Sequence, residues 1–459
     1  MSNPIGKLRR QLLSPHADDR RIAIGFLYVS LFVLVGKFAG AAKEMAIAWR
    51  YGVSAVVDAY VLVFSIVTWP VALWLNVLSI ALVPVLVRTA NEDPADLARF
   101  RGELLAWNLL LAAVLAGLAW QLLPALVDAG WFAISDRVRP LAVAAAKTLA
   151  LAVPFGLLAS YFATLLMAQG RYRNTLLEAM PSVAILAALM APAGWVPAPL
   201  LWGTVAGFLV QAALLAHLSR AHTDLALVRP GFRAAAWQGV GGSVVVLIAG
   251  QAIASLNTIV DQALAARVGE GAASSLAYAG RVMALVLGMG AVGLGRATLH
   301  VFAEVHQQRR DALFRLALKW SALACGAGIV AAILLWAAAP LAVGLLFERG
   351  AFTAADTAAV THLLRIYTAQ LPFYFATTVL MNYLASAGLH RNIALAAALA
   401  LVGKLAFLAL PLPWPRVDML AASSAVFTLI WLAAELVPAI RLGRRAVDNR
   451  GVDGEKGTR

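Results

Sequence analysis

The chain has 459 residues, of which 62% are apolar and only 13% charged, and its mean hydropathy is +0.81. This composition leaves too little polar surface to coat a soluble globule of this length, so lipid is the expected solvent. The net charge of +14 does not indicate a nucleic-acid partner, because the basic residues are spread between the apolar runs. Cys325 is the single cysteine, which excludes a disulfide framework within one chain.

Apolar runs long enough for a membrane-spanning helix recur along the whole chain, separated by short charged or Gly- and Pro-containing breaks. They predict an all-α, polytopic membrane bundle of about twelve transmembrane helices. A charged N-terminal segment, 1–21, precedes the helices, and a charged tail, 441–459, follows them. The expected spans are 22–49, 56–87, 104–127, 141–168, 174–192, 198–218, 237–264, 275–303, 313–346, 357–388, 392–411 and 417–440.

Lysine and arginine concentrate at the two ends of the chain and in the even-numbered connections between spans. Because cytoplasmic loops carry the excess of basic residues, both termini are predicted to be cytoplasmic. The N-terminal segment shows no short apolar region followed by a cleavage site, so no removable signal is expected. Trp131, Trp195 and Trp414 then fall near the outer interface, where aromatic residues are common.

The sequence contains an internal repeat with an offset of about 218 residues. Six helices per repeat preserve orientation, which predicts parallel repeats that form two lobes around a central cavity. The predicted domains are an N-lobe at 22–220, a cytoplasmic linker at 221–236 and a C-lobe at 237–440. The matching landmarks are 50–60 with 267–278, 126–132 with 346–352, and 154–174 with 372–392.

Charged residues inside the first predicted span are candidates for function, because a charge in the bilayer needs a partner, a wet cavity or a role. Lys37 and Lys43 are candidates to hold a diphosphate, with Glu44 in a supporting role. The alternative is that Lys43 pairs with Glu44 or Asp58 while Lys37 extends to the interface. Asp58 opens the second span and is either a supporting residue or that helix's N-cap.

In the second half, Arg281 is the cation expected to meet those of the first span, since a guanidinium binds phosphate bidentately. Its alternative is a structural pair with Asp261. Asp261 is also a candidate for coupling to a cation, and Arg365 is a supporting or interfacial residue. Lys404, like Lys147, is assigned to an interfacial or structural position.

Signatures of enzymes are not found in the sequence. It contains no nucleotide-binding Gly-Lys-Ser/Thr loop and no His-Glu-x-x-His pair, and no outer connection is long enough for a catalytic domain. A transporter without catalytic residues, cofactor or metal is therefore expected, driven by the membrane potential, protons or sodium.

Three motifs stand out: 36–60 with Gly36-Lys37 and Asp58-Ala59-Tyr60, 261–281 with Asp261-Gln262 and Gly280-Arg281, and 346–352. Together they resemble the MurJ (MviN-type) lipid II flippase family of the multidrug/oligosaccharidyl-lipid/polysaccharide (MOP) exporter superfamily. The resemblance covers roughly 20–440. It implies that Lys37, Lys43 and Arg281 contact a diphosphate head group and that Asp58 matches a functional aspartate. The family usually has arginines where this chain has Lys37 and Lys43, and an acidic residue at Ala284.

The resemblance implies a flippase for an undecaprenyl-diphosphate-linked saccharide in the bacterial cytoplasmic membrane, which would serve peptidoglycan synthesis, the cell wall and cell shape. The cargo is lipid II or an exopolysaccharide repeat unit. Membrane lipids and envelope glycosyltransferases or polymerases are the expected partners. The alternatives are a drug or organic-cation exporter of the same superfamily, which would need cavity carboxylates, and a scaffold for envelope synthesis that transports nothing.

Overall fold

The structure is a computed structural model that describes residues 35–456 except 133, 170–175, 193, 221–228, 239–247, 249–256, 258, 289–309 and 388. The predicted N-terminal segment 1–21 lies outside the described residues, as do parts of the first, seventh and eighth predicted spans and of the linker. Every regular element in the described part is a helix, which confirms the all-α fold class.

Helices alone satisfy every backbone hydrogen bond within one segment, which is what a bilayer demands of an open bundle. The described residues include six helices long and apolar enough to cross a membrane, or seven if a bent pair counts as one span. They are Ala55–Ala90, Pro94–Asp128, Pro199–Ser219, Leu313–Phe347, Arg391–Ala409 and Arg416–Leu442, with the bent pair Val138–Ala150 and Ala152–Ala168.

The chain packs as two compact units that do not coincide with contiguous halves. Unit 1 contains Met1–Ala46, Val67–Leu123 and Ala146–Ile248, and unit 2 contains Ile47–Ile66, Pro124–Ala145 and Ala249–Arg459. Unit 2 thus combines two short segments of the first repeat with the whole second half. The predicted division into lobes at 22–220 and 237–440 stays a prediction.

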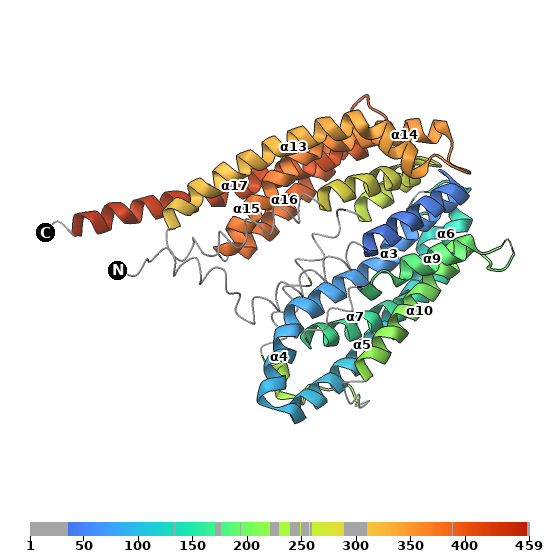
Figure 1. Ribbon diagram of the computed structural model, residues 1–459, viewed down its shortest axis with the longest axis horizontal. Coiled ribbons are helices and arrows are strands. Elements are labelled where there is room, and N and C mark those ends of the chain that lie inside the picture. The colour runs from blue at the N-terminus through green and yellow to red at the C-terminus, as the bar shows by residue number, and fades with distance from the viewer. Residues whose placement is uncertain are drawn as a thin grey trace, which may run out of the picture. The chain divides into compact units, whose positions relative to one another are not determined.

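The helices that supply unit 1 surround a core of buried leucine, alanine and aromatic side chains. Within unit 1, α10 packs against both α9 and α7, and α7 packs against α4. Figure 1 shows these elements in blue to green. The helices are α3 (Ala55–Val77), which ends in unit 1, η1 (Leu78–Leu82), α4 (Val83–Glu92), α5 (Pro94–Asp128), α7 (Ala152–Ala168), α9 (Met180–Met190), α10 (Pro199–Arg220) and η2 (Ala235–Trp237).

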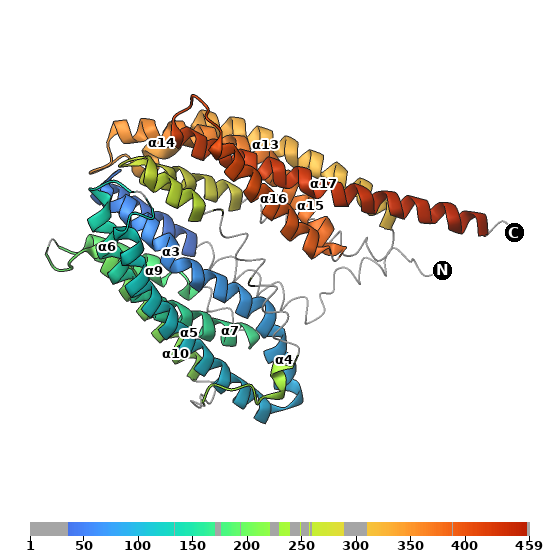
Figure 2. The same ribbon diagram turned by 180° about the vertical axis from the view of Figure 1, so that it is seen from behind.

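Unit 2 is built mainly from long helices of the second half, which lie side by side in Figures 1 and 2. α13 packs on α15, and α17 packs on both α15 and α16. A helix at 259–268 and the helix Ala272–Gly288 belong to the same unit. The labelled helices are α6 (Val138–Ala150), α13 (Arg310–Phe347), α14 (Ala354–Tyr367), η3 (Thr368–Gln370), α15 (Leu371–Ser386), α16 (His390–Ala409) and α17 (Arg416–Lys456).

The tenth predicted span, 357–388, is not one straight helix. Thr353 and Asp356 form a reciprocal capping box that starts α14, and the turn η3 then separates α14 from α15. Pro372, near the start of α15, has no N–H to continue the preceding ladder of hydrogen bonds. α17 runs on to Lys456, through the predicted charged tail.

The surface of α13 shows directly which solvent the bundle requires. Ile333, Leu334, Leu341 and Leu345 each expose more than 60% of their area. An apolar band of this length would aggregate in water, whereas in a bilayer it faces acyl chains at no cost.

Candidate functional site

Two of the three landmark pairs of the internal repeat, 50–60 with 267–278 and 126–132 with 346–352, meet in unit 2 and form one cluster. We call this cluster the repeat junction and define it as residues 49–58, 131–137, 267–278 and 350–352. Within it, segments of the first repeat contact segments of the second, although the contacting segments lie more than 130 positions apart in the chain.

Asp58 forms the most buried polar contact of the repeat junction. Its carboxylate is 1% exposed and accepts the backbone N–H of Gly271 through Oδ2 at 2.5 Å and that of Ser274 through Oδ1 at 2.7 Å. These N–H groups lie at the start of the helix Ala272–Gly288, Gly271 just before it and Ser274 in its first turn, where backbone N–H groups have no partner within the helix. Asp58 therefore caps a helix of the second repeat. The alternative that it caps its own helix, α3, is wrong.

Close backbone approach brings two loops of the junction together. The amide of Ala351 donates to the carbonyl of Trp49 at 2.8 Å, and the hydroxyl of Tyr278 donates to the carbonyl of Gly52 at 3.1 Å. Gly52 and Gly350 both have positive φ, +58° and +65°, and a Cβ on either would collide with backbone of the facing loop. Only glycine fits these positions, which explains why Gly52 and Gly350 occur in the repeated motifs.

The repeat-related contact on the other side of the junction uses a side chain instead of backbone. The guanidinium of Arg267 donates to the carbonyls of Trp131 at 2.8 Å and Phe132 at 3.1 Å. Arg137 and Glu270 add an ion pair at 3.3 Å, in which the arginine is largely exposed. In both contacts, a loop of one repeat binds a loop of the other repeat to which it does not correspond in sequence.

Lys37 and Lys43 lie on the helix at 35–51 and have different surroundings. Lys37 is exposed, whereas Lys43 is 8% exposed and its Nζ lies 2.8 Å from Oε1 of Glu44. Six positions on a helix correspond to about 240° of rotation, so the two ammonium groups point to different sides. The predicted Lys43–Glu44 ion pair is present, and Lys37 is the cation of this helix that is exposed.

Arg281 is exposed on the helix Ala272–Gly288, two turns after the end that Asp58 caps. Lys37 and Lys43 belong to unit 1 and Arg281 to unit 2, so a diphosphate site that combines them stays a prediction. Asp261 pairs with Lys404 and not with Arg281, because Lys404 Nζ lies 2.5 Å from Oδ1 of Asp261. Lys404 itself is 0% exposed, so it is structural and does not reach the interface.

Arg365 occupies a packing position on α14. Its Nε donates to the carbonyl of Trp336 at 3.2 Å, and its Cζ lies 4.5 Å from the centre of the Trp336 ring. This cation–π contact holds α14 against α13, so a supporting structural role explains Arg365 without a ligand.

A second polar cluster, which the sequence did not point to, fixes the end of the linker in unit 1. Glu103 is 1% exposed and accepts the N–H groups of Arg233 and Ala234 and the indole N–H of Trp237. Asp96 accepts the amides of Ala235 and Ala236. We call this arrangement the linker clamp. Glu103 lies one position before the predicted span 104–127. A carboxylate at the end of a span is usually solvent-exposed, so nothing in the sequence indicated its buried role.

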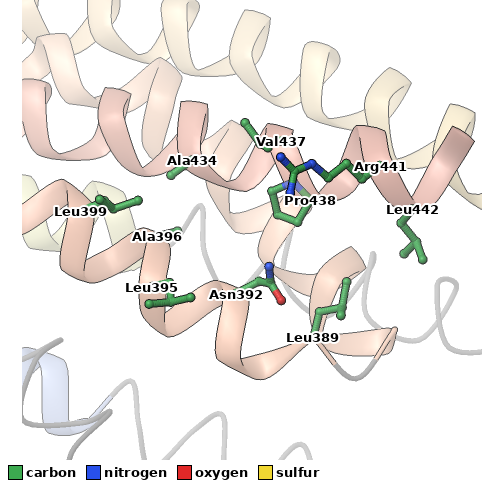
Figure 3. A pocket seen from close by; sticks show the side chains of 10 residues that line it. All are labelled: Leu389, Asn392, Leu395, Ala396, Leu399, Ala434, Val437, Pro438, Arg441 and Leu442. Carbon is green, nitrogen blue, oxygen red and sulfur yellow. The ribbon is translucent and has the colours of Figure 1, made fainter.

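An open groove of about 440 Å³ lies between the helices α16 and α17 (Figure 3). Its walls are mostly apolar, with Leu395 and Leu399 on α16 and Val437 and Pro438 on α17. Asn392 and Arg441 supply polar groups near one end, where their side chains lie on facing helices. The groove offers an apolar surface of the kind that lipid chains contact.

Comparison with solved structures identifies the fold. The fold is that of the MOP exporters: it matches a structure described as lipid II flippase MurJ in an inward closed conformation, with a TM-score of 0.77 and 16% identity over 92% of this chain and 91% of the other. It also matches an inward-facing multidrug resistance MATE family transporter of the MOP superfamily, with a TM-score of 0.72 and 14% identity over 92% of this chain and 99% of the other.

The chain belongs to the lipid II flippase MurJ family, whose model matches residues 47–440. It is 28% identical over 352 residues to the lipid II flippase MurJ of Burkholderia cenocepacia, which covers 72% of this chain and 64% of that protein. It is 26% identical over 324 residues to the probable lipid II flippase MurJ of Bdellovibrio bacteriovorus, covering 66% and 60%. The matched region thus spans less than two thirds of either relative. The family that the motifs resemble is confirmed.

Proposed function

We propose that this protein is a flippase that translocates an undecaprenyl-diphosphate-linked saccharide across the bacterial cytoplasmic membrane by alternating access. The observation that carries the proposal is the family match over 47–440. The cargo is lipid II or an exopolysaccharide repeat unit. Its diphosphate is anionic, which agrees with the excess of cations that the chain carries.

The repeat junction supplies the step at which this mechanism would be controlled. With both termini in the cytoplasm, as the distribution of lysine and arginine predicts, the junction lies at the outer face of the membrane. Its contacts join the two repeats there, so cargo can leave outward only after they break. The contact of Asp58 with Gly271 and Ser274 is the central one, because it is both buried and charge-assisted.

In this proposal Lys37, Lys43 and Arg281 hold the diphosphate, and Asp58 governs opening of the junction. Lys37 and Arg281 are exposed on their helices, whereas Lys43 is buried 2.8 Å from Glu44. The groove between α16 and α17 is the surface that we assign to lipid chains. Envelope glycosyltransferases or polymerases are the enzymes that would supply or consume such a cargo.

The test is reconstitution of the full chain into liposomes with fluorescent polyprenyl-diphosphate saccharides, using a membrane-impermeant quencher to follow their transfer between leaflets. We expect wild type to translocate them and Arg281→Ala to be strongly impaired. Arg88→Ala is the matched control, because that arginine is exposed on α4 and makes only a 3.8 Å contact with Glu92. Full activity in Arg281→Ala would contradict the assigned site.

Two further measurements separate the alternatives. Parallel assays with lipid II and with an exopolysaccharide lipid intermediate decide the cargo. Efflux of an organic cation without saccharide transfer would support a drug exporter of the same superfamily. Absence of transfer with every cargo would overturn the proposed function and leave a scaffold role.

A further inference from the structure

Lys404 is a fully buried cation, 0% exposed, in the second half of α16, which runs from His390 to Ala409. A lysine in this position cannot place its ammonium in water, so it must have partners inside the protein. The structure gives it two oxygen ligands from a neighbouring segment of unit 2, Asp261 and Asn257. Asp261 lies on the helix at 259–268 and Asn257 lies four positions before it in the chain, and both side chains reach the Lys404 ammonium.

The geometry around the ammonium resembles that of a bound monovalent cation. Lys404 Nζ lies 2.5 Å from Oδ1 of Asp261 and donates to Oδ1 of Asn257 at 2.7 Å. The ring of Phe427, on α17, lies 5.8 Å away and presents its π system to the same charge. A carboxylate and an amide oxygen that converge on one point are the ligands that hard cations such as Na⁺ prefer.

The charge balance of this cluster leaves no place for a second cation. The Asp261 carboxylate is one negative charge, and Lys404 already neutralises it at contact distance. A sodium ion among the same oxygens would lie within a few ångströms of the ammonium in a medium of low dielectric constant, where repulsion between like charges is strong. The residues present therefore do not fit a mobile cation at Asp261, although that aspartate by itself is a natural candidate for coupling.

We propose that Lys404 is a tethered cation that permanently fills a monovalent-cation site formed by Asp261 and Asn257. Asp261 of the wild-type protein then neither binds sodium nor couples transport to a sodium gradient. Removal of the ammonium leaves a carboxylate that needs a new counter-ion, and the vacated site accepts Na⁺. The binding claim is independent of transport, whereas the statement on coupling rests on the proposed flippase function.

The experiment compares purified full-length variants in NaCl and in choline chloride at equal ionic strength. Thermal unfolding and direct ²²Na⁺ binding are measured for wild type, Lys404→Ala and the double variant Lys404→Ala/Asp261→Asn. We expect a saturable rise in Tm with Na⁺, and binding at least about tenfold tighter than in wild type, equivalent to about 1.4 kcal/mol, in Lys404→Ala alone. Lys147→Ala is the control, because that lysine is exposed on α6.

Three results would overturn the proposal. One is sodium binding by wild type that Asp261→Asn abolishes. Another is a folded Lys404→Ala protein that does not respond to Na⁺. If Lys404→Ala folds in neither salt, Lys404→Gln replaces it, and the third contradicting result is a Lys404→Gln protein that does not respond to Na⁺. A Lys404→Ala protein that folds only in NaCl would support the proposal. Flippase assays with and without a sodium gradient test the coupling, and a lack of translocation under all conditions would count against the proposed function only.

Discussion

Asp58 and Ser274 lie 216 positions apart, and the carboxylate of the first accepts the backbone N–H of the second at 2.7 Å. The aspartate belongs to the first repeat and the serine to the second, so this one hydrogen bond joins the two copies of the internal repeat. The same carboxylate also accepts the amide of Gly271. Its place at the positive end of a helix dipole strengthens both bonds.

Asp58→Asn should weaken the repeat junction, because an amide offers one acceptor oxygen where two N–H groups need acceptors. We expect a loss of roughly 1–3 kcal/mol of stability, the range for a lost cap and a buried donor left unpaired. Opening of the junction is measured by maleimide labelling of a Val53→Cys thiol in a Cys325→Ala background, since Val53 faces Gly271.

Asp136→Asn is the control for this experiment, because that carboxylate is 98% exposed in the same region. Labelling and Tm should not change in the control. Equal labelling rates in Asp58→Asn and Asp136→Asn would show that Asp58 does not hold the junction closed.

Gly52→Ala tests the close backbone approach between the loops of the two repeats. The substitution combines a positive φ of +58° with a collision between the new Cβ and the carbonyl of Ala351. We expect a loss of at least about 2 kcal/mol, above the ~1–2 kcal/mol that left-handed backbone alone costs a residue with a Cβ. Thermal unfolding in detergent gives the comparison.

Gly130→Ala separates the two causes, because Gly130 has a φ of +79° but a Cβ there meets open space. It should cost less than Gly52→Ala. If both variants lose the same stability, backbone strain alone explains the effect and the close approach contributes nothing.

Glu103→Gln should release the linker clamp. The Glu103 carboxylate is 1% exposed and accepts hydrogen bonds from two backbone N–H groups and the indole N–H of Trp237. Glutamine replaces one of its acceptor oxygens with an NH2 group, which would face these N–H donors. We expect a loss of roughly 1–3 kcal/mol. Trypsin should also cleave faster after Arg229 or Arg233, which lie in the clamped segment.

The matched control for the clamp is Glu92→Gln, whose carboxylate is 67% exposed and makes a single weak contact. It should change stability by no more than about 0.5 kcal/mol. Unchanged trypsin cleavage in Glu103→Gln would mean that the aromatic contacts of Trp237 fix the linker without the carboxylate.

Lys43→Met should be destabilising because it removes the ammonium 2.8 Å from the Glu44 carboxylate, in a pair whose side chains are only 10% and 13% exposed. We expect a loss of roughly 1–3 kcal/mol, between the values for exposed and fully buried pairs. The double variant with Glu44→Gln should recover most of it, which a double-mutant cycle measures. Additive losses of stability in the double-mutant cycle would rule out a stabilising Lys43–Glu44 pair.

Lys37→Met removes an exposed cation and should leave Tm unchanged while it slows translocation.

The sequence by itself determined the class of solvent, the all-α fold and the repeat. Long apolar runs can only be helices in a bilayer, and the landmarks 50–60 and 267–278 match without any structure. The sequence also named Glu44 and Asp58 as alternative partners of Lys43. The pair with Glu44 could be predicted because the two charged residues are adjacent in the chain.

Only the tertiary structure decided which distant residues meet. Asp58 caps a helix of the other repeat, Asp261 is neutralised by Lys404, and Glu103 holds a linker segment 130 positions away. Each of these contacts joins charged or polar groups from separate segments, and helical periodicity says nothing about which segments pack together. Desolvation then selects the pairs, since a carboxylate or ammonium buried in a membrane protein persists only where packing brings it a partner.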